Sequence, residues 1–503
     1  VIQLFTRNGE GPTRWRAALG GGTYGTAKAE LSAQGGTARF GWSGAVGEQR
    51  SAGIYEFNNG FENRVMSGGL RVAPRDGTTL RLNARYGSNR YQYPTDFAGA
   101  VIDRNAQQVT HRAQLGLEAT QRVSERVSLH IVGTRGENLP KSNDDRDSPG
   151  DTLGFYGYHA QGRVMRSAVD VRTDIAAGAR HTVSVGAAYA DDRERSSNIS
   201  LSQYGDFPGA FRAARTTRSL YAQALGDATP RLSYSFGGRI DDNSAFDVFR
   251  TVRAGAGWRL AERTRLRASA GNAFKAPTFG ENYASGFVVG NPDLRPEQTR
   301  TVEVGVDQRF VRGATTIRFT GFRQQFRDLI QYRGGLGTTA APNYFNLAAA
   351  NANGLESEFA VRIRGTSLAF NHSWTATRVV DAGADTAKSA NFVRGQPLLR
   401  RPSQAVAGVL SRAVAGGQGS VTAQWVGARA DRDFASFPAK AVTLAPYARI
   451  DLAYEHPLRW HVGAEPTSLL VRLDNAFDRR YEAIYGFRAP GRAWFVGARI
   501  GAR

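Results

Sequence analysis

Residues 302–310 read Val-Glu-Val-Gly-Val-Asp-Gln-Arg-Phe, so apolar and polar side chains alternate along most of this stretch. In an extended strand the valines face one way and the charged residues face the other. The same alternation recurs in residues 355–364 and 448–455. Segments of about ten such residues have the length that a tilted β-strand needs to cross a bilayer. The pattern therefore predicts membrane-spanning β-strands.

The composition is compatible with such strands and excludes membrane helices. The 503 residues contain no run of about 18 apolar residues, the minimum for a helical span. The mean hydropathy is that of a soluble protein, as expected when each strand faces lipid on one side and a polar lumen on the other. The chain has no cysteine, which excludes disulfides, Cys-ligated metals and thiol nucleophiles.

The net charge of +21 would suit a nucleic-acid binder if the basic residues formed a patch or a tail. They are instead dispersed, as in residues 80–86, where arginines alternate with leucines. We therefore expect no nucleic-acid partner. A basic excess of this kind suits a lumen wall and loops that touch outer-membrane lipid and anionic lipopolysaccharide.

Short and long connections alternate between the predicted strands, and nine of the ten short ones carry Gly, Pro, Asp or Ser, which favour turns. The ten short connections are residues 33–36, 74–77, 122–125, 177–180, 226–230, 261–263, 311–313, 364–366, 415–419 and 457–466. With a first strand at 14–20 and a last strand at 491–503, they predict an all-β, antiparallel transmembrane β-barrel of about 22 strands with short periplasmic turns and long extracellular loops. The alternative, a soluble propeller or solenoid, would repeat one motif at a fixed period, which this chain does not.

No motif indicates catalysis or a catalytic cofactor. Residues 20–25 fit G-x-G-x-x-G, but no helix follows, so we interpret them as a short outer loop. The seven histidines lack metal-binding spacing, and no serine lies in G-x-S-x-G. We expect no enzyme, although catalytic residues that only the fold brings together stay an alternative.

Aromatic residues in two loops are the predicted substrate-binding positions, because their rings could stack on an incoming ligand. These positions are Tyr91, Tyr93, Phe155, Tyr156 and Tyr158. The alternative is that the rings belong to the aromatic girdle at the lipid interface.

A compact acidic group interrupts the basic chain at Asp144, Asp145, Asp147 and Asp151. Carboxylates on a loop can bind Ca²⁺, but the spacing is not that of an EF-hand. A Ca²⁺ site in the outer loops and a solvated acidic loop are both open interpretations.

Two motifs resemble the signatures of TonB-dependent outer-membrane receptors. Residues 272–283 and 290–297 resemble the family's Phe-(Arg/Lys)-Ala-Pro and Gly-Asn-Pro-x-Leu-x-Pro-Glu signature, and residues 474–492 resemble its closing Asn-x-Phe-Asp and Pro-Gly-Arg motif. The matching positions are Phe274, Pro277, Gly290, Asn291, Pro292, Pro296, Glu297, Asn475, Phe477 and Tyr481.

Residues 398–401, 431–438 and 481–486 resemble the vitamin B12 (cobalamin) branch of that family. The resemblance implies a monomeric receptor in the bacterial outer membrane that imports scarce cobalamin by active transport, energised by the TonB complex. It also implies Ca²⁺ in the outer loops. The alternatives are a ferric-siderophore or haem receptor of the same family, and a passive porin, which would have about 16 to 18 strands.

The two ends of the chain depart from the family pattern. Residues 1–6 read as a strand similar to the last strand of the family's plug, so we interpret 1–13 as the plug end and linker and 14–503 as the barrel. The plug and the TonB-contacting box are expected in a longer precursor, and TonB would act through that part. The chain ends Ile-Gly-Ala-Arg rather than on an aromatic residue, so Trp494 and Phe495 are candidates for the targeting signal.

Overall fold

The computed structural model describes residues 9–310, 314–333, 341–383, 391–436, 438–462 and 465–502. The strand expected at residues 1–6 and the turn expected at 311–313 lie outside these residues, as do positions 463–464 of the turn expected at 457–466. Among the described residues, no helix is long and apolar enough to cross a membrane.

Nearly all regular elements are strands. In chain order they are β1 (Arg14–Gly22), β2 (Thr26–Gly36), β3 (Phe40–Ser51), β4 (Phe61–Val72), β5 (Thr78–Gln92), β6 (Gln107–Arg122), β7 (Val127–Asp144), β8 (Phe155–Ala176), β9 (His181–Ser202), β10 (Phe207–Thr229), β11 (Leu232–Asn243), β12 (Phe246–Ala261), β13 (Thr264–Lys275), α1 (Phe279–Tyr283), β14 (Glu297–Phe310), β15 (Thr315–Tyr332), β16 (Tyr344–Ile363), β17 (Thr366–Asp381), β18 (Gln404–Val414), β19 (Gly417–Val426), β20 (Arg429–Asp433), β21 (Lys440–Leu444), β22 (Tyr447–Val462), β23 (Glu465–Asp474), β24 (Glu482–Ile484), β25 (Phe487–Arg488) and β26 (Ala493–Ala502).

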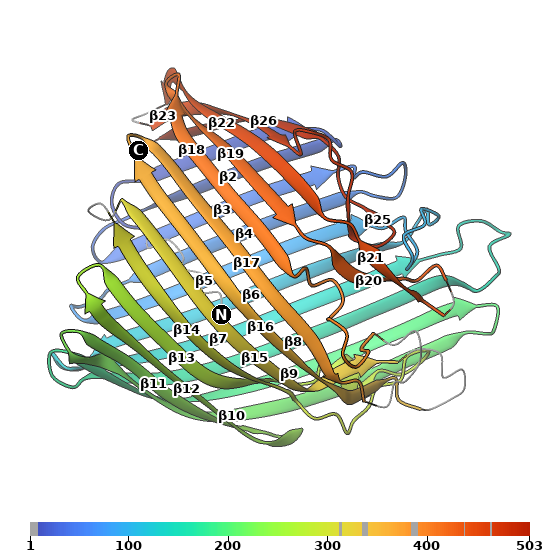
Figure 1. Ribbon diagram of the computed structural model, residues 1–503, viewed down its shortest axis with the longest axis horizontal. Coiled ribbons are helices and arrows are strands. Elements are labelled where there is room, and N and C mark those ends of the chain that lie inside the picture. Colours follow the sequence, from blue (N-terminus) through green and yellow to red (C-terminus); the bar gives the residue numbers. More distant parts are fainter. Residues whose placement is uncertain are drawn as a thin grey trace.

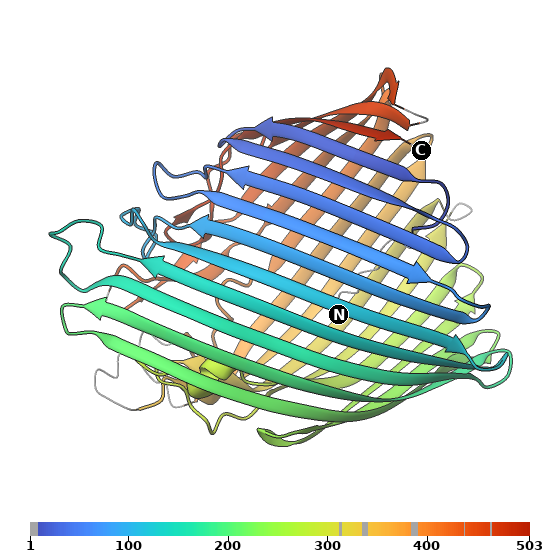
Figure 2. The ribbon, with the colours of Figure 1, turned by 180° about the vertical axis from the view of Figure 1, so that it is seen from behind.

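The described strands form one closed antiparallel barrel of 22 strands, which confirms the predicted fold and strand number. Each barrel strand pairs with its neighbour in the chain, and β1 pairs with β26 from Trp15 opposite Ala502 to Gly22 opposite Phe495. The hairpins β20–β21 and β24–β25 lie outside the barrel sheet. Figures 1 and 2 show the two sides of the wall, with β14–β19 in front in one view and β1–β9 in front in the other.

The wall has one apolar face and one polar face, as the period-two pattern predicts. Val302 and Val304 of β14 are 53% and 60% exposed and face outward, where lipid covers them. Asp307, on the other face of β14, lies 3.1 Å from Nε of Arg267 on β13. Ion pairs of this kind line the lumen, so polar groups on the inner face have partners within the wall.

Four predicted turns are wrong by a few residues. Residues 417–419 belong to β19, and residues 457–462 and 465–466 belong to β22 and β23. Residues 33–36 belong to β2, and the reversal lies at 37–39; residues 226–229 still belong to β10. At the last two places the backbone ladder with the next strand continues through the glycines, as Gly36 pairs with Gly41. Glycine marks a candidate turn, but the register of the partner strand decides where the chain reverses.

Residues 9–13 precede the barrel and contact its short-turn end. Gly9 has a φ of +67°, and a Cβ there would lie 2.3 Å from the carbonyl oxygen of Trp42, so only glycine fits against this backbone. Gly36 donates its N–H to the carbonyl of Gly11 at 2.9 Å. The approach to the barrel is therefore fixed by backbone contacts.

The seam between β1 and β26 generates a test of closure. A Cβ at Gly22 would lie 2.1 Å from the carbonyl oxygen of Trp494, so Gly22→Ala should force the two strands apart and cost about 1–3 kcal/mol. Thermal unfolding in detergent should show the loss. Gly44→Ala on β3, where nothing lies within 4 Å of the new methyl group, should leave the unfolding temperature unchanged. Equal effects of the two variants on the unfolding temperature would contradict the close contact of β1 with β26 at Gly22.

Candidate functional site

The loop between β13 and β14 begins with a short capped helix. Thr278 Oγ1 accepts the N–H of Glu281 at 3.1 Å, and the Glu281 carboxylate accepts the N–H of Thr278 at 2.6 Å. This reciprocal pair satisfies two free donors at the start of α1. Pro277 directly precedes the N-cap residue Thr278 and is fully buried.

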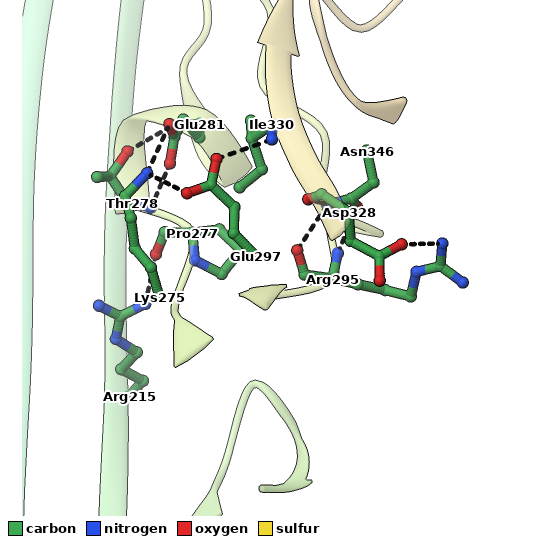
Figure 3. A network of polar contacts seen from close by, with 10 residues as sticks. All are labelled: Arg215, Lys275, Pro277, Thr278, Glu281, Arg295, Glu297, Asp328, Ile330 and Asn346. Atoms are coloured by element: carbon green, nitrogen blue, oxygen red, sulfur yellow. Dashed lines mark hydrogen bonds and ion pairs between the residues drawn. The ribbon is translucent and has the colours of Figure 1, made fainter. Parts of the chain in front are cut away.

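Side chains from strands on both sides hold this loop, as Figure 3 shows. Arg215 of β10 donates to the carbonyl of Pro277 at 2.6 Å, and its guanidinium lies 4.7 Å from the centre of the Phe279 ring. Glu297 accepts the N–H of Ile330 on β15 at 2.9 Å and lies 3.1 Å from Lys275 Nζ. Arg215 lies on the inner face of β10, so the loop folds over the lumen.

The second half of the loop contains the Gly-Asn-Pro motif, and its contacts explain the motif. A Cβ at Gly290 would lie 2.5 Å from the backbone of Asn282, so glycine is required there. Asn291 donates to the carbonyl of Tyr344 at 2.9 Å and accepts from Asn282 Nδ2 at 2.9 Å. Pro292 and Pro296 lie in this same stretch before β14.

The three segments quoted for the cobalamin branch meet at one buried carboxylate. Asp431 is 0% exposed, and its Oδ1 accepts Arg400 Nε and the N–H of Arg432, both at 2.9 Å. Its Oδ2 accepts the N–H of Tyr485 at 2.9 Å. We call Asp431 with Arg400, Arg432 and Tyr485 the loop latch, because it joins three outer loops that are distant in sequence.

The closing motif forms a separate buried turn. Asn475 donates to the carbonyls of Arg479 and Pro490 at 2.9 and 3.3 Å, and it has a φ of +50°. Tyr481 stacks on Tyr447 with ring centres 4.0 Å apart. Phe477, by contrast, is 78% exposed. Of these motif residues, Asn475 and Tyr481 hold the turn, whereas Phe477 projects from it.

The predicted aromatic positions lie at the extracellular ends of β5 and β8, where Tyr93 interacts electrostatically with Tyr158 and Asp144. The Tyr91 and Tyr93 rings are 5.7 Å apart. Phe155 packs edge-on against Phe287 of the β13–β14 loop at 4.6 Å. The remaining two positions contact charged groups: the Tyr156 ring lies 4.3 Å from the Arg146 guanidinium, and Tyr158 is opposite Asp144 in the β7–β8 ladder. Phe274, of the family motif, stacks on Phe249 at 4.6 Å.

The predicted acidic residues are partly drawn together, and a fifth carboxylate joins them. Asp144, at the extracellular end of β7 and far beyond the lipid-facing Ile131, contacts Asp103 from the preceding loop. Burial and the nearby Asp103 carboxyl raise the pKa of Asp144 to about 7. A single sequence does not show this contact, because the two residues lie in different loops.

The other acidic residues have protein partners. Asp147 accepts the N–H of Arg104 at 2.8 Å, Asp151 accepts the N–H of Asp147 at 3.2 Å, and Asp145 lies 3.3 Å from His159 Nε2. In the part of the chain that the structure describes, no three His, Asp or Glu residues are arranged as a ready metal site.

A cavity of about 380 Å³ opens on the inner wall where β13–β17 meet residues 398–401. Its polar lining combines both charges with neutral groups: Arg267, Arg401, Glu303, Glu356, Glu358, Thr320, Gln324, Thr375 and Thr377. The Phe322 ring also lines the cavity and covers Gly354, where a Cβ would lie 2.3 Å from the ring. The alternation places the strand residues on the lumen face, but only the fold brings Arg401 to them.

The loop latch generates a prediction. In Asp431→Asn, an amide group replaces a carboxylate oxygen that accepts hydrogen bonds, so a buried donor loses its partner at a cost of about 3 kcal/mol. Hydrogen exchange should then accelerate at the amides of Arg432 and Tyr485. Asp433→Asn, two residues along and hydrogen-bonded to the N–H of Ala435, is the matched control and should leave those amides protected. Unchanged exchange in Asp431→Asn would show that the latch does not order the loops.

Comparisons with known proteins agree with this architecture. Residues 11–476 match the family described as TonB dependent receptor-like, beta-barrel. The siderophore receptor PirA from Acinetobacter baumannii has a TM-score of 0.78 at 15% identity, with the match covering 99% of this chain and 81% of that one. The copper transporter OprC also has a TM-score of 0.78 at 15% identity, covering 99% and 82%. The ferric citrate transporter FecA has a TM-score of 0.78 at 12% identity, covering 99% and 79%.

The structural likenesses show the fold, and the family match covers most of the chain. Its members are receptors and transporters rather than enzymes, and they lie in the outer membrane. This chain, a closed outer-membrane barrel of 22 strands, belongs to the family of TonB-dependent receptors.

Proposed function

We propose that this barrel imports scarce cobalamin across the outer membrane by active transport, energised by the TonB complex through a part of the receptor that precedes the barrel. The observation that carries the choice of ligand is the loop latch. The three segments that resemble the cobalamin branch are not scattered: Arg400, Asp431 and Tyr485 join them at one buried point. A shared, fixed loop arrangement is what recognition of one large, rigid ligand requires.

The proposed mechanism makes and breaks no covalent bond. The latched outer loops and the inner-wall cavity hold the ligand by polar contacts and shape. Arg401 supplies donors and Glu356 supplies acceptors for the amide groups of a ligand. Arg267 and Glu358 add to them, although they also pair with Asp307 and Arg318 within the wall. Release into the periplasm then requires work on the receptor from the TonB complex, because the wall itself is rigidly hydrogen-bonded.

A ferric siderophore or haem is the second candidate. Arg267 and Arg401 in the inner-wall cavity favour it, because guanidinium groups pair well with the carboxylates or phenolates of an anionic ligand. PirA and FecA are named as a siderophore receptor and a ferric citrate transporter. The 22-stranded barrel does not favour a passive porin, since porins have about 16 to 18 strands.

Equilibrium binding to the full-length receptor tests the ligand and the cavity together. We expect cyanocobalamin to bind and Thr375→Trp, which fills the cavity, to weaken binding by about tenfold or more. Ala376→Trp is the matched control, because this neighbour on β17 faces lipid with Trp374 and a tryptophan is tolerated there. Tight binding of a ferric chelate without binding of cyanocobalamin would move the assignment to siderophores. Equal affinity of both variants would exclude the cavity.

We also propose that Asp103 and Asp144 hold a Ca²⁺ ion that stiffens the outer loops. Carboxylate oxygens are the ligands that Ca²⁺ prefers, and these two groups are close enough to share a proton. Asp103 is itself fixed by the N–H groups of Asn105 and Ala106, at 3.0 and 2.6 Å. A cation that replaces the shared proton would remove the repulsion between the two carboxylates.

This proposal predicts a pH dependence with a definite sign. Because the pKa of Asp144 is about 7, its carboxyl is protonated below that pH and must lose the proton when Ca²⁺ binds. Calcium affinity, measured by calorimetry, should fall by about fivefold between pH 7 and pH 6, and binding should release protons. Asp144→Asn should abolish binding, whereas Asp145→Asn, with an exposed carboxylate, should retain it. A pH-independent affinity would contradict the proposal.

A further inference from the structure

Three arginines lie directly opposite one another on adjacent strands. In the ladders of β8, β9 and β10, Arg195 is the partner of both Arg163 and Arg212. Like charges that are directly opposite destabilise a sheet, and here two such pairs are adjacent. We call these three residues the arginine row.

The arginine row faces the outside of the barrel. Val169 of β8, Val185 of β9 and Leu220 of β10 are 42%, 50% and 66% exposed on the lipid-facing side. An even number of residues separates each of them from the arginine on its own strand, and no register shift intervenes. The row therefore continues the lipid-facing side of the wall above the apolar band.

Nearby carboxylates neutralise only one of the three arginines. Arg163 has an ion pair with Glu137 of β7. Among the described residues, no carboxylate lies within ion-pair distance of Arg195 or Arg212. On β9, Asp192 and Glu194 face the lumen, where Asp192 pairs with Arg166 at 2.9 Å, and the outward-facing Asp191 pairs with Arg193 at 2.7 Å. The outward surface therefore keeps an excess of positive charge.

An apolar groove of about 380 Å³ lies below the row on the same face. At the base of the groove lies Gly133, which has no side chain to fill it, and nothing lies within 4 Å of the place that a Cβ would occupy. Leu117, Val169 and Tyr189 form the sides of the groove. Arg135, two residues beyond Gly133 on β7, lies at the rim. The groove has the shape and polarity for an acyl chain, and its outer end carries a cation.

The height of the row decides which lipid fits. We take Val169 as the outer edge of the apolar band on β8, because the next outward residue is Ser167. From Val169 to Arg163 the strand rises about 20 Å, or about 14 Å along the membrane normal at a tilt near 45°. The headgroup region of a bilayer is only about 5–8 Å thick on each side. A phospholipid phosphate would reach Arg135 but not the row, whereas a glycolipid with phosphorylated sugars reaches both.

We propose that this face is a binding site for a phosphorylated glycolipid of the outer leaflet, lipopolysaccharide, with an acyl chain in the groove and phosphates on Arg135 and the arginine row. Guanidinium groups bind phosphate through paired hydrogen bonds, and a phosphate between Arg163, Arg195 and Arg212 would convert mutual repulsion into attraction. This inference does not depend on which ligand the receptor imports.

The test compares the purified barrel with Arg195→Ala/Arg212→Ala in detergent. Added lipopolysaccharide should raise the unfolding temperature of the unaltered barrel by about 3–5 °C and that of the variant by less than half as much. Without lipid, the variant should be at least as stable, because the repulsion is gone. Arg300→Ala/Arg378→Ala is the matched control: both arginines face outward on β14 and β17, opposite neutral residues, and the variant should respond like the unaltered barrel.

Two further lipids make the outcome decisive. Dephosphorylated lipopolysaccharide should give little stabilisation, and phosphatidylglycerol should stabilise the unaltered barrel and the arginine-row variant equally. An equal response of all three proteins to lipopolysaccharide would overturn the proposal. So would a larger effect of phosphatidylglycerol on the unaltered barrel than on the variant, since it would assign the row to any anionic lipid.

Discussion

The pairing of β1 with β26 is the constraint on which the rest of the structure depends. Inside a bilayer no water is available to unpaired backbone groups, so a sheet that crosses it must have no edge. The ladder from Trp15 to Gly22 removes the last one. Closure fixes which way every side chain faces, and this separates a lipid-facing surface from the polar lumen where the outer loops and the inner-wall cavity lie.

Above the bilayer a few buried polar groups order the long loops. The loop latch at Asp431 joins three of them, and Glu297 with Arg215 ties a fourth to strands on two sides. A buried carboxylate is costly to leave without donors, so Asp431, which is 0% exposed, has one well-determined arrangement. The motif residues that resemble the family signature mostly serve this order: Gly290 and Asn475 shape the backbone rather than face a ligand.

The fold was predictable from the sequence because its main signal is local. Alternation along residues 302–310 reports the two faces of the wall, and regular reversals report the strand number. The exact positions of the turns were less predictable. Residues 33–36 include two glycines, yet they pair with β3 and belong to the strand. The contacts of the site depend on pairs from different loops, such as Asp103 with Asp144, and no spacing along the chain reports those. The arginine row likewise depends on register, because only the pairing of β8, β9 and β10 places Arg195 between two other arginines.

The strands differ in length around the barrel, and this makes the mouth oblique. β8, β9 and β10 have 22, 22 and 23 residues, whereas β19, β23 and β26 have 10 each. Figure 2 shows the long green and cyan strands on the side opposite the short red ones. The wall is therefore high on the side of β8–β10. On the side of β19, β23 and β26 it is lower, and loops cover it. The two sides of the opening therefore differ in construction: one side is continuous sheet, and the other is completed by the hairpins β20–β21 and β24–β25.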